Sequence, residues 1–159
     1  MALDIDGKLL KSNIEALLDE TIRDVKGIYL DGGTSLTETL SAVSAEEASR
    51  SILEGGTTIA GHVDHLRFYL RVLKDYMDGK PTDKIDWSQS WLRKSVTESE
   101  WEDLKSNLSE DFQRLQAGIA EIDDWNDEKR LGGALAIIAH TSYHLGAIRQ
   151  MLKVIKKRG

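Results

Sequence analysis

The sequence predicts an all-α fold: a four-helix bundle with long crossover connections and a short extra helix between the first and second long helices. Apolar residues recur at intervals of three and four along four long segments, which is the repeat of one face of an α-helix. No alternation of polar and apolar residues of useful length indicates a β-strand. Because each segment has an apolar face, packing the four together as a bundle buries those faces most economically.

The first long helix is expected over about residues 4–25. Its apolar face contains Leu10, Ile14, Leu17, Leu18, Ile22 and Val25. After a glycine-containing interruption, Ser44 and Glu47 have the spacing of a capping box, in which each side chain bonds the other residue's backbone N–H. This box predicts the short extra helix, ending at about Leu53.

The second long helix is expected from about residue 58 to residue 78. Gly55 and Gly56 end the preceding element, and either Thr57 or Thr58 can cap the new helix. The following stretch, residues 79–96, contains the only proline of the chain and is predicted to be a loop.

The third long helix begins with a second capping box, formed by Thr97 and Glu100. Its face contains Trp101, Leu104, Leu108, Phe112, Leu115, Ile119 and Ile122. The fourth helix is capped by Asn126 or Asp127 and extends to about Lys156. Its nearly continuous run of small and apolar residues at 131–139 predicts the most buried helix of the four.

All four histidines lie in two pairs on predicted helices, His62 with His65 and His140 with His144. Residues four apart on a helix share one face, so the second pair can hold one metal ion. The apolar residues around it predict that this face points into the core. On a helical wheel both members of the first pair fall in the apolar arc, and the spacing alone leaves open which of them reaches an ion.

The number of imidazoles decides what a metal would do. Three with an open fourth position form a reactive zinc-type centre, whereas four close the coordination sphere and indicate a structural role. Peptidase chemistry is not expected, because Thr141 stands where a zinc metalloprotease has a glutamate after the first histidine. A di-iron site needs a glutamate three residues before each of two histidines, and the sequence has none there.

Composition narrows the possible functions further. The 159 residues fit a single domain, residues 1–159. The formal net charge of −6 opposes binding to nucleic acid, and we expect none. Without cysteine the chain has no disulfide, no thiolate ligand and no thiol nucleophile, so any thiol comes from outside. No targeting sequence is evident, and no stretch approaches the 18 or more apolar residues of a membrane span, so we expect a cytoplasmic protein without membrane contact.

The segments TIAGHVDHLRFYL and HTSYHLGAIRQ resemble the DinB-like superfamily of metal-binding four-helix-bundle proteins, and the likeness spans nearly the whole chain. Its most specific part is His140-x-x-Tyr143-His144-x-Gly146. The sequence departs from the family at Ala147, where a glutamine is common, and this departure concerns the pocket more than the ligands.

The resemblance implies a ligand set, because the family has one metal-binding histidine on the second helix and a His-x-x-x-His pair on the fourth. In that register the ligand on the second helix is His65 and not His62. The implied ligands of a divalent ion, nickel or zinc above all, are therefore His65, His140 and His144. Members commonly dimerise, so the resemblance also implies a homodimer.

Family members include thiol transferases that use bacillithiol or mycothiol and a mycothiol-dependent isomerase. The resemblance thus implies a metal-dependent thiol transferase, or a related hydrolase or isomerase, that activates a low-molecular-weight thiol for attack on an electrophilic substrate. The alternative is a non-catalytic stress-response or binding module whose metal is structural. No catalytic base is identified, because Tyr69 and Tyr143 have the ordinary packing role of tyrosines at helix interfaces and Asp64 lies on the charged arc.

Overall fold

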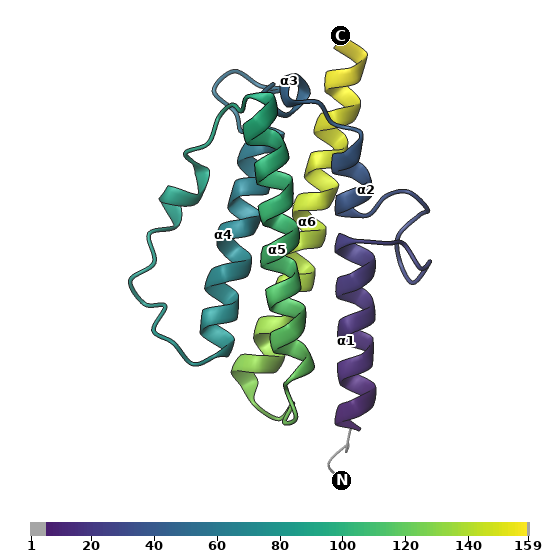
Figure 1. Cartoon of the computed structure of the whole chain (residues 1–159), viewed down its shortest axis with the longest axis vertical. Coiled ribbons are helices and arrows are strands. Elements are labelled where there is room, and N and C mark those ends of the chain that lie inside the picture. The colour runs from purple at the N-terminus through teal and green to yellow at the C-terminus, as the bar shows by residue number, and fades with distance from the viewer. Residues whose placement is uncertain (1–5, 159) are drawn as a thin grey trace.

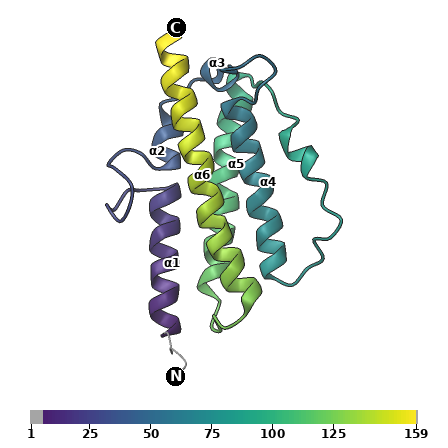
Figure 2. The same cartoon turned by 180° about the vertical axis from the view of Figure 1, so that it is seen from behind.

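The computed structural model describes residues 6–158, and this part of the chain is helical without a β-strand, which confirms the all-α prediction. Four long helices lie side by side (Figures 1 and 2). They are α1 (Gly7–Ile22), α4 (Ile59–Met77), α5 (Glu98–Ala120) and α6 (Glu128–Arg158). The two capping residues expected for the long helices of the second half, Thr97 and Asp127, both accept backbone N–H groups at the starts of α5 and α6.

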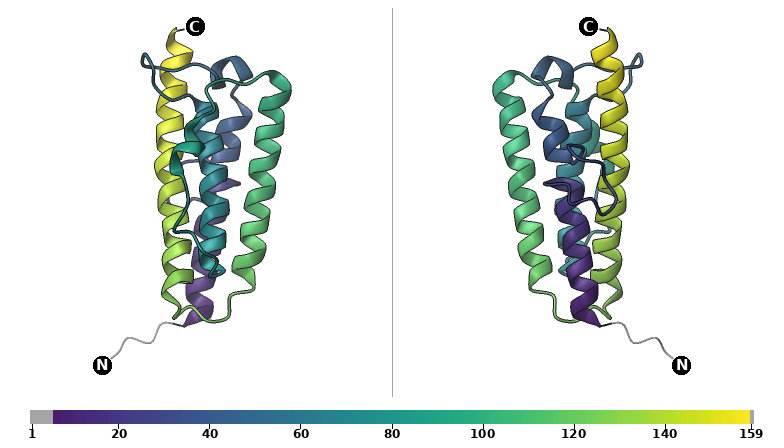
Figure 3. Two further views of the ribbon diagram at one scale, coloured as in Figure 1. Left: turned by 90° about the vertical axis from the view of Figure 1, so that its left-hand side faces the viewer. Right: turned by 90° about the vertical axis from the view of Figure 1, so that its right-hand side faces the viewer.

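The helix α4 has neighbours on two sides, because it packs extensively against both α5 and α6, while α1 packs mainly against α6. Figure 1 shows α4 and α5 running in the same direction and α6 running the opposite way. The chain between α4 and α5 therefore returns along the whole length of α4, outside the packed helices (Figure 3). This arrangement places α4 directly against α6, the two helices that carry the histidines.

The connection between α1 and α4 holds two short helices, of which only one was predicted. The unpredicted helix, α2 (Leu36–Ser41), starts at its own capping box between Ser35 and Glu38. The apolar repeat is too short to indicate a helix of this length, but Leu36 and Leu40 are buried in the core. The capping box was thus the only local signal for α2.

The predicted short helix is present as α3 (Ala45–Ala48), but it ends well before Leu53. The side chain of Ser49 explains this early end, because its hydroxyl accepts the backbone N–H of Val96 at 3.0 Å and so ties the chain to the start of α5. Beyond it, Ser51 pairs with Thr58 in an isolated antiparallel bridge, which requires extended backbone. Contacts between distant segments therefore override the local helical tendency.

The first long helix is shorter than predicted at its end, and its predicted start at Asp4 lies outside the described residues. It stops at Ile22 because the buried carboxylate of Glu20 bonds the segment that follows. The two oxygens accept the backbone N–H groups of Lys26, Ile28, Tyr29 and Leu30 at 2.7–2.9 Å. Gly27, with φ of +80°, allows the turn between these donors.

These hydrogen bonds also set the charge of Glu20. Burial alone would raise the pKa of its carboxyl group, but the four N–H donors favour the ionised form and lower the pKa to about 2. The carboxylate is therefore ionised at neutral pH and acts as the acceptor around which the 26–30 segment is ordered.

The prediction that the fourth helix is the most buried is wrong. Nine of the 31 residues of α6 are buried, against ten of the 19 residues of α4. The reason is position: α4 has a helix on either side and the returning connection outside it, whereas α6 leaves one side uncovered. The large side chains of Leu135 and Tyr143 lie exposed on that side, 49% and 71% accessible.

By length and composition, α6 meets the criterion for a helix that crosses a membrane. Residues 131–148 contain no Asp, Glu, Lys or Arg, and the most apolar window of 18 residues has a mean hydropathy of 1.2. No stretch of this kind is expected from the sequence, because glycine, histidine, threonine, serine and tyrosine interrupt the apolar residues of this window. Core helices of soluble proteins meet the same criterion, and 39% of this window is buried against the rest of the chain.

Replacing Glu20 with Gln tests the ordering role of its carboxylate. The amide nitrogen of Gln cannot accept N–H groups, so part of the cluster loses its acceptor and the melting temperature should fall by several degrees. Hydrogen exchange at the amides of Ile28 and Leu30 should accelerate at the same time. The control is Glu15→Gln, which removes the same charge from the same helix. Equal stability and equal exchange in the two variants would contradict this role.

Candidate metal centre

Three imidazole rings from two helices converge between α4 and α6. The Nε2 atom of His140 lies 3.0 Å from Nε2 of His65 and 3.1 Å from Nε2 of His144. Two nitrogens about 2.1 Å from one ion, at bond angles of roughly 90–110°, lie about 3.0–3.4 Å apart. The three residues that the family resemblance implies as ligands are thus brought together: both contacts to His140 have spacings that suit one metal ion, and the ligand atoms of all three lie within 4.8 Å of one another.

The local fold explains this convergence. His140 and His144 follow one another on the inner face of α6, with ring centroids 4.4 Å apart. His65 is buried on α4, which packs against that face. Both histidines of α4 are buried, so the helical wheel was right to place them in the apolar arc, but they have different neighbours.

The connection between α4 and α5 supplies a second layer around His65. A short 3-10 helix, η1 (Trp87–Trp91), lies against α4, and Gly61 permits the approach, since a Cβ atom there would lie 2.9 Å from the carbonyl oxygen of Arg93. The ring of Trp91 stacks on His65, with centroids 4.0 Å apart and 15° between planes. The expected loop is therefore partly helical, and it covers one side of the site.

Ser90, also on η1, determines which nitrogen of His65 is free. Its hydroxyl donates to the carbonyl oxygen of Trp87 at 2.7 Å and lies 2.7 Å from Nδ1 of His65. A carbonyl cannot donate, so the serine hydrogen is used there and Nδ1 of His65 must donate to the serine oxygen. The Nε2 atom of His65 then carries a lone pair, as a metal ligand requires.

Two tyrosines border the other rings. Tyr69 stacks on His140, with centroids 3.7 Å apart and 15° between planes. Burial raises the pKa of the Tyr69 phenol above its usual value of 10, so this group is protonated at neutral pH and does not serve as a base. Tyr143 meets His144 edge to face at 5.0 Å and is largely exposed, so the site adjoins the surface beside it.

His62 lies behind His144 and outside the converging group. Its Nδ1 atom is 2.8 Å from Nδ1 of His144, which is the nitrogen on the far side of the ring from the cluster. Its Nε2 atom is 2.9 Å from the hydroxyl of Thr57. Thr58 caps α4, which leaves Thr57 available for this contact.

The surroundings keep all four imidazoles neutral at pH 7. Burial, reinforced by His140, His62 and His65, lowers the pKa of His144 to about 3. Burial, with contributions from His140 and His62, lowers the pKa of His65 to about 4. Burial also lowers the pKa values of His62 and His140 below the usual 6.5. Neutral rings retain the lone pairs that a metal ion needs.

The three converging neutral imidazoles cannot satisfy all of their ring nitrogens with hydrogen bonds to one another. With a lone pair on Nε2 of His65, the two short N···N contacts can be hydrogen bonds only if a single hydrogen on His140 is shared between them. An ion that accepts all three lone pairs at once is the better match for this donor set, because the nitrogens are of the type and number found at zinc-type centres. The residues present therefore fit a divalent metal ion.

Ser90 and Thr57 were not identified as functional residues from the sequence. The sequence places Trp87 and Trp91 in the predicted loop, where such tryptophans could cover the site but more often pack against the helices or a second subunit. The sequence does contain one usable signal. Asp86 accepts the backbone N–H of Ser88 at 3.0 Å, a local Asp-x-Ser turn that starts η1. That turn predicts a compact loop, but not that the loop lies on His65.

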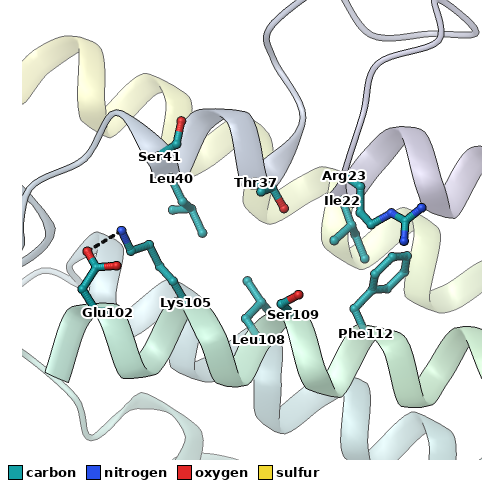
Figure 4. A pocket seen from close by; sticks show the side chains of 10 residues that line it. All are labelled: Ile22, Arg23, Thr37, Leu40, Ser41, Glu102, Lys105, Leu108, Ser109 and Phe112. Carbon is teal, nitrogen blue, oxygen red and sulfur yellow. Dashed lines mark ion pairs between the residues drawn. The ribbon is translucent and has the colours of Figure 1, made fainter. Parts of the chain in front are cut away.

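A separate hollow of about 250 Å³ lies between α5 and the α1–α2 region (Figure 4). Its floor is apolar, with buried side chains that include Leu108 and Phe112. At its rim Lys105 pairs with Glu102 at 2.7 Å, as Figure 4 shows. No set of unpaired polar groups converges there among the residues described, so the histidine cluster is the better candidate site.

The family model described as the DinB superfamily matches residues 31–148, a range that includes both histidine pairs and η1. No curated protein and no solved structure matches the chain.

The lowered imidazole pKa values predict how the metal-free protein responds to acid. In the unfolded chain histidines protonate near their ordinary pKa of about 6.5, while in the folded protein His65 and His144 stay neutral down to about 4 and 3. The unfolded state therefore binds more protons, and the free energy of unfolding should fall steadily from pH 7.5 to pH 5.5.

Denaturant titrations of metal-free protein measure this decline. The variant His144→Gln, which removes one of the titrating rings, should show a weaker pH dependence over the same range. A stability that is constant or rises as the pH falls to 5.5 would contradict the neutral, buried state of the rings.

Proposed function

The chain belongs to the DinB superfamily, and on this premise we propose that it is a divalent-metal-binding four-helix-bundle protein whose ion activates a low-molecular-weight thiol toward an electrophile. The observation that carries the proposal is the convergence of three Nε2 atoms at 3.0 and 3.1 Å. His65, His140 and His144 would hold the ion, with nickel or zinc as the expected metals.

A divalent ion at this position would act as a Lewis acid and lower the pKa of a thiol that binds to it. The protein contributes neutral imidazoles, held by Ser90 and by the stacked rings of Trp91 and Tyr69. In the proposed reaction the S–H bond of the thiol breaks and its proton passes to solvent, while the sulfur forms a bond to the electrophilic carbon. The bond from that carbon to its leaving group breaks, and the leaving group departs with the electron pair and takes a proton from solvent. The chain itself has no cysteine, so no thiol of its own competes with the bound thiol for the electrophile.

An open coordination position distinguishes this proposal from a purely structural metal. His62 would close the coordination sphere if it were a fourth ligand, but its two nitrogens face His144 and Thr57. The half-buried His140 supports access to the site from solvent. These contacts favour a reactive centre over a stress-response or binding module with a structural metal.

We also propose that two copies of the chain associate through the uncovered side of α6. What supports this is the exposure of Leu135 and Tyr143 on a stretch, residues 131–148, without a charged side chain. Sedimentation velocity at micromolar concentrations should give a dimer. Leu135→Glu should give a monomer, because it places two like charges in the buried contact. A monomeric wild-type protein would exclude this interface.

Removing any one of the three proposed ligands should abolish stoichiometric metal binding. Metal analysis after equilibration with Zn²⁺ or Ni²⁺ and removal of free ion should give about one ion per chain for the wild type, and far less for His65→Ala, His140→Ala and His144→Ala. Gln150→Ala, an exposed change on α6, serves as the control and should bind like the wild type. Full retention of metal in the histidine variants would reject the site.

Activity is tested with the metal-loaded protein, using a panel of cellular thiols paired with carbon electrophiles. Thiol consumption should depend on the metal and should disappear in His144→Ala while persisting in Gln150→Ala. A protein that binds metal stoichiometrically but consumes no thiol with any pair would instead favour the structural module.

A further inference from the structure

The contact between His62 and His144 assigns a role to the fourth histidine. We propose that His62 is a positioning residue, which accepts a hydrogen bond from Nδ1 of His144 and thereby keeps the lone pair of His144 on Nε2. This inference rests on the proposed metal site, but the contacts that form the hydrogen-bond chain are seen directly between the side chains. The evidence consists of the partners available to each ring nitrogen.

The first step fixes His65. Because Ser90 donates its hydrogen to the carbonyl oxygen of Trp87, it can only accept from Nδ1 of His65, and Nε2 of His65 has no hydrogen. This ring therefore accepts at the cluster and cannot donate there.

The second step concerns His140, whose Nε2 atom is in contact with both other rings. If His144 donated to His140, the lone pairs of His140 and His65 would face each other at 3.0 Å without a hydrogen between them. If His140 donates instead, one shared hydrogen serves both contacts. The second arrangement avoids the conflict, and it leaves a lone pair on Nε2 of His144.

The third step follows from the single hydrogen of a neutral imidazole. With a lone pair on Nε2, His144 carries its hydrogen on Nδ1, which lies 2.8 Å from Nδ1 of His62. His62 must then accept, and its own hydrogen is on Nε2, where it donates to the hydroxyl of Thr57 at 2.9 Å. The chain of donors thus runs in one direction, from His144 through His62 to Thr57.

Packing holds His62 in the orientation that this chain needs. The ring is 9% exposed and meets the ring of Trp91 edge to face, with centroids 5.3 Å apart and 88° between planes. The same tryptophan stacks on His65. Trp91 therefore restrains both histidines of α4: His65, which is a proposed ligand, and His62, which is the proposed acceptor for His144.

Removing the acceptor should weaken metal binding without removing a ligand. In His62→Phe the buried N–H of His144 loses its partner, and the ring is free to place its hydrogen on Nε2, where it blocks the metal. Loss of such an outer contact weakens metal binding by roughly 10–100-fold. His62→Asn retains an oxygen near the position of Nδ1 and should recover most of the affinity. Competition for Zn²⁺ against a chelator of known affinity measures both variants.

A control separates this effect from general destabilisation. Val63 is fully buried on α4 next to His62, but it is not a member of the hydrogen-bond chain. Val63→Ala should therefore lower the melting temperature while leaving the Zn²⁺ affinity within a few fold of the wild type. A loss of affinity in Val63→Ala as large as in His62→Phe would overturn the positioning role.

Nitrogen NMR of the metal-free protein tests the same inference without metal. The imidazole of His144 should carry its hydrogen on Nδ1 and that of His62 on Nε2, and His62→Phe should shift His144 toward the other tautomer. The opposite tautomers in the wild type would overturn the proposal, and so would unchanged Zn²⁺ affinity in His62→Phe. Complete loss of binding in both His62 variants would make His62 a ligand instead. If the wild type binds no metal, the proposed function fails while the tautomers still test the hydrogen-bond chain.

Discussion

The structure depends on holding several neutral imidazoles together in a buried space. Imidazole lone pairs that point at one another repel unless a cation or a hydrogen lies between them, and burial disfavours protonation of the rings. The pKa of His144, lowered to about 3, expresses this constraint. The lowered pKa values disfavour a proton on these rings, and the three histidines could hold a metal ion. The antiparallel contact of α4 and α6 and the returning connection outside α4 both serve to maintain the cluster.

The segments around the cluster show how a long connection becomes part of a site. The chain between α4 and α5 has to travel the length of the protein because both helices run in the same direction. On the way, η1 provides Ser90 as an acceptor and Trp91 as a flat apolar cover for His65. In the connection between α1 and α4, the ionised carboxylate of Glu20 accepts backbone N–H groups in a similar way. In both connections a buried polar side chain bonds a group from another segment: Ser90 bonds the ring of His65, and Glu20 bonds the backbone of residues 26–30.

Sequence reasoning recovered the features that arise from local periodicity. The i, i+4 spacing of His140 and His144 and the capping box at Thr97 were sufficient to predict the helices and a shared face, and the structure contains both. The choice between His62 and His65 could not be made from spacing, because both lie in the apolar arc of α4. It came from a family resemblance, and the structure places His65, but not His62, in the group of three nitrogens. The roles of Ser90 and Thr57 depend on contacts made only after folding, and no local pattern predicts them.

The most direct test of the metal centre is X-ray absorption spectroscopy of the protein loaded with one equivalent of Zn²⁺. It should show three imidazole nitrogens at about 2.0–2.1 Å together with a non-imidazole ligand that exchanges when a thiol is added. Four imidazoles around the ion would contradict the open centre and the role assigned to His62. A spectrum without imidazole ligands would contradict the central claim, that His65, His140 and His144 share one metal ion.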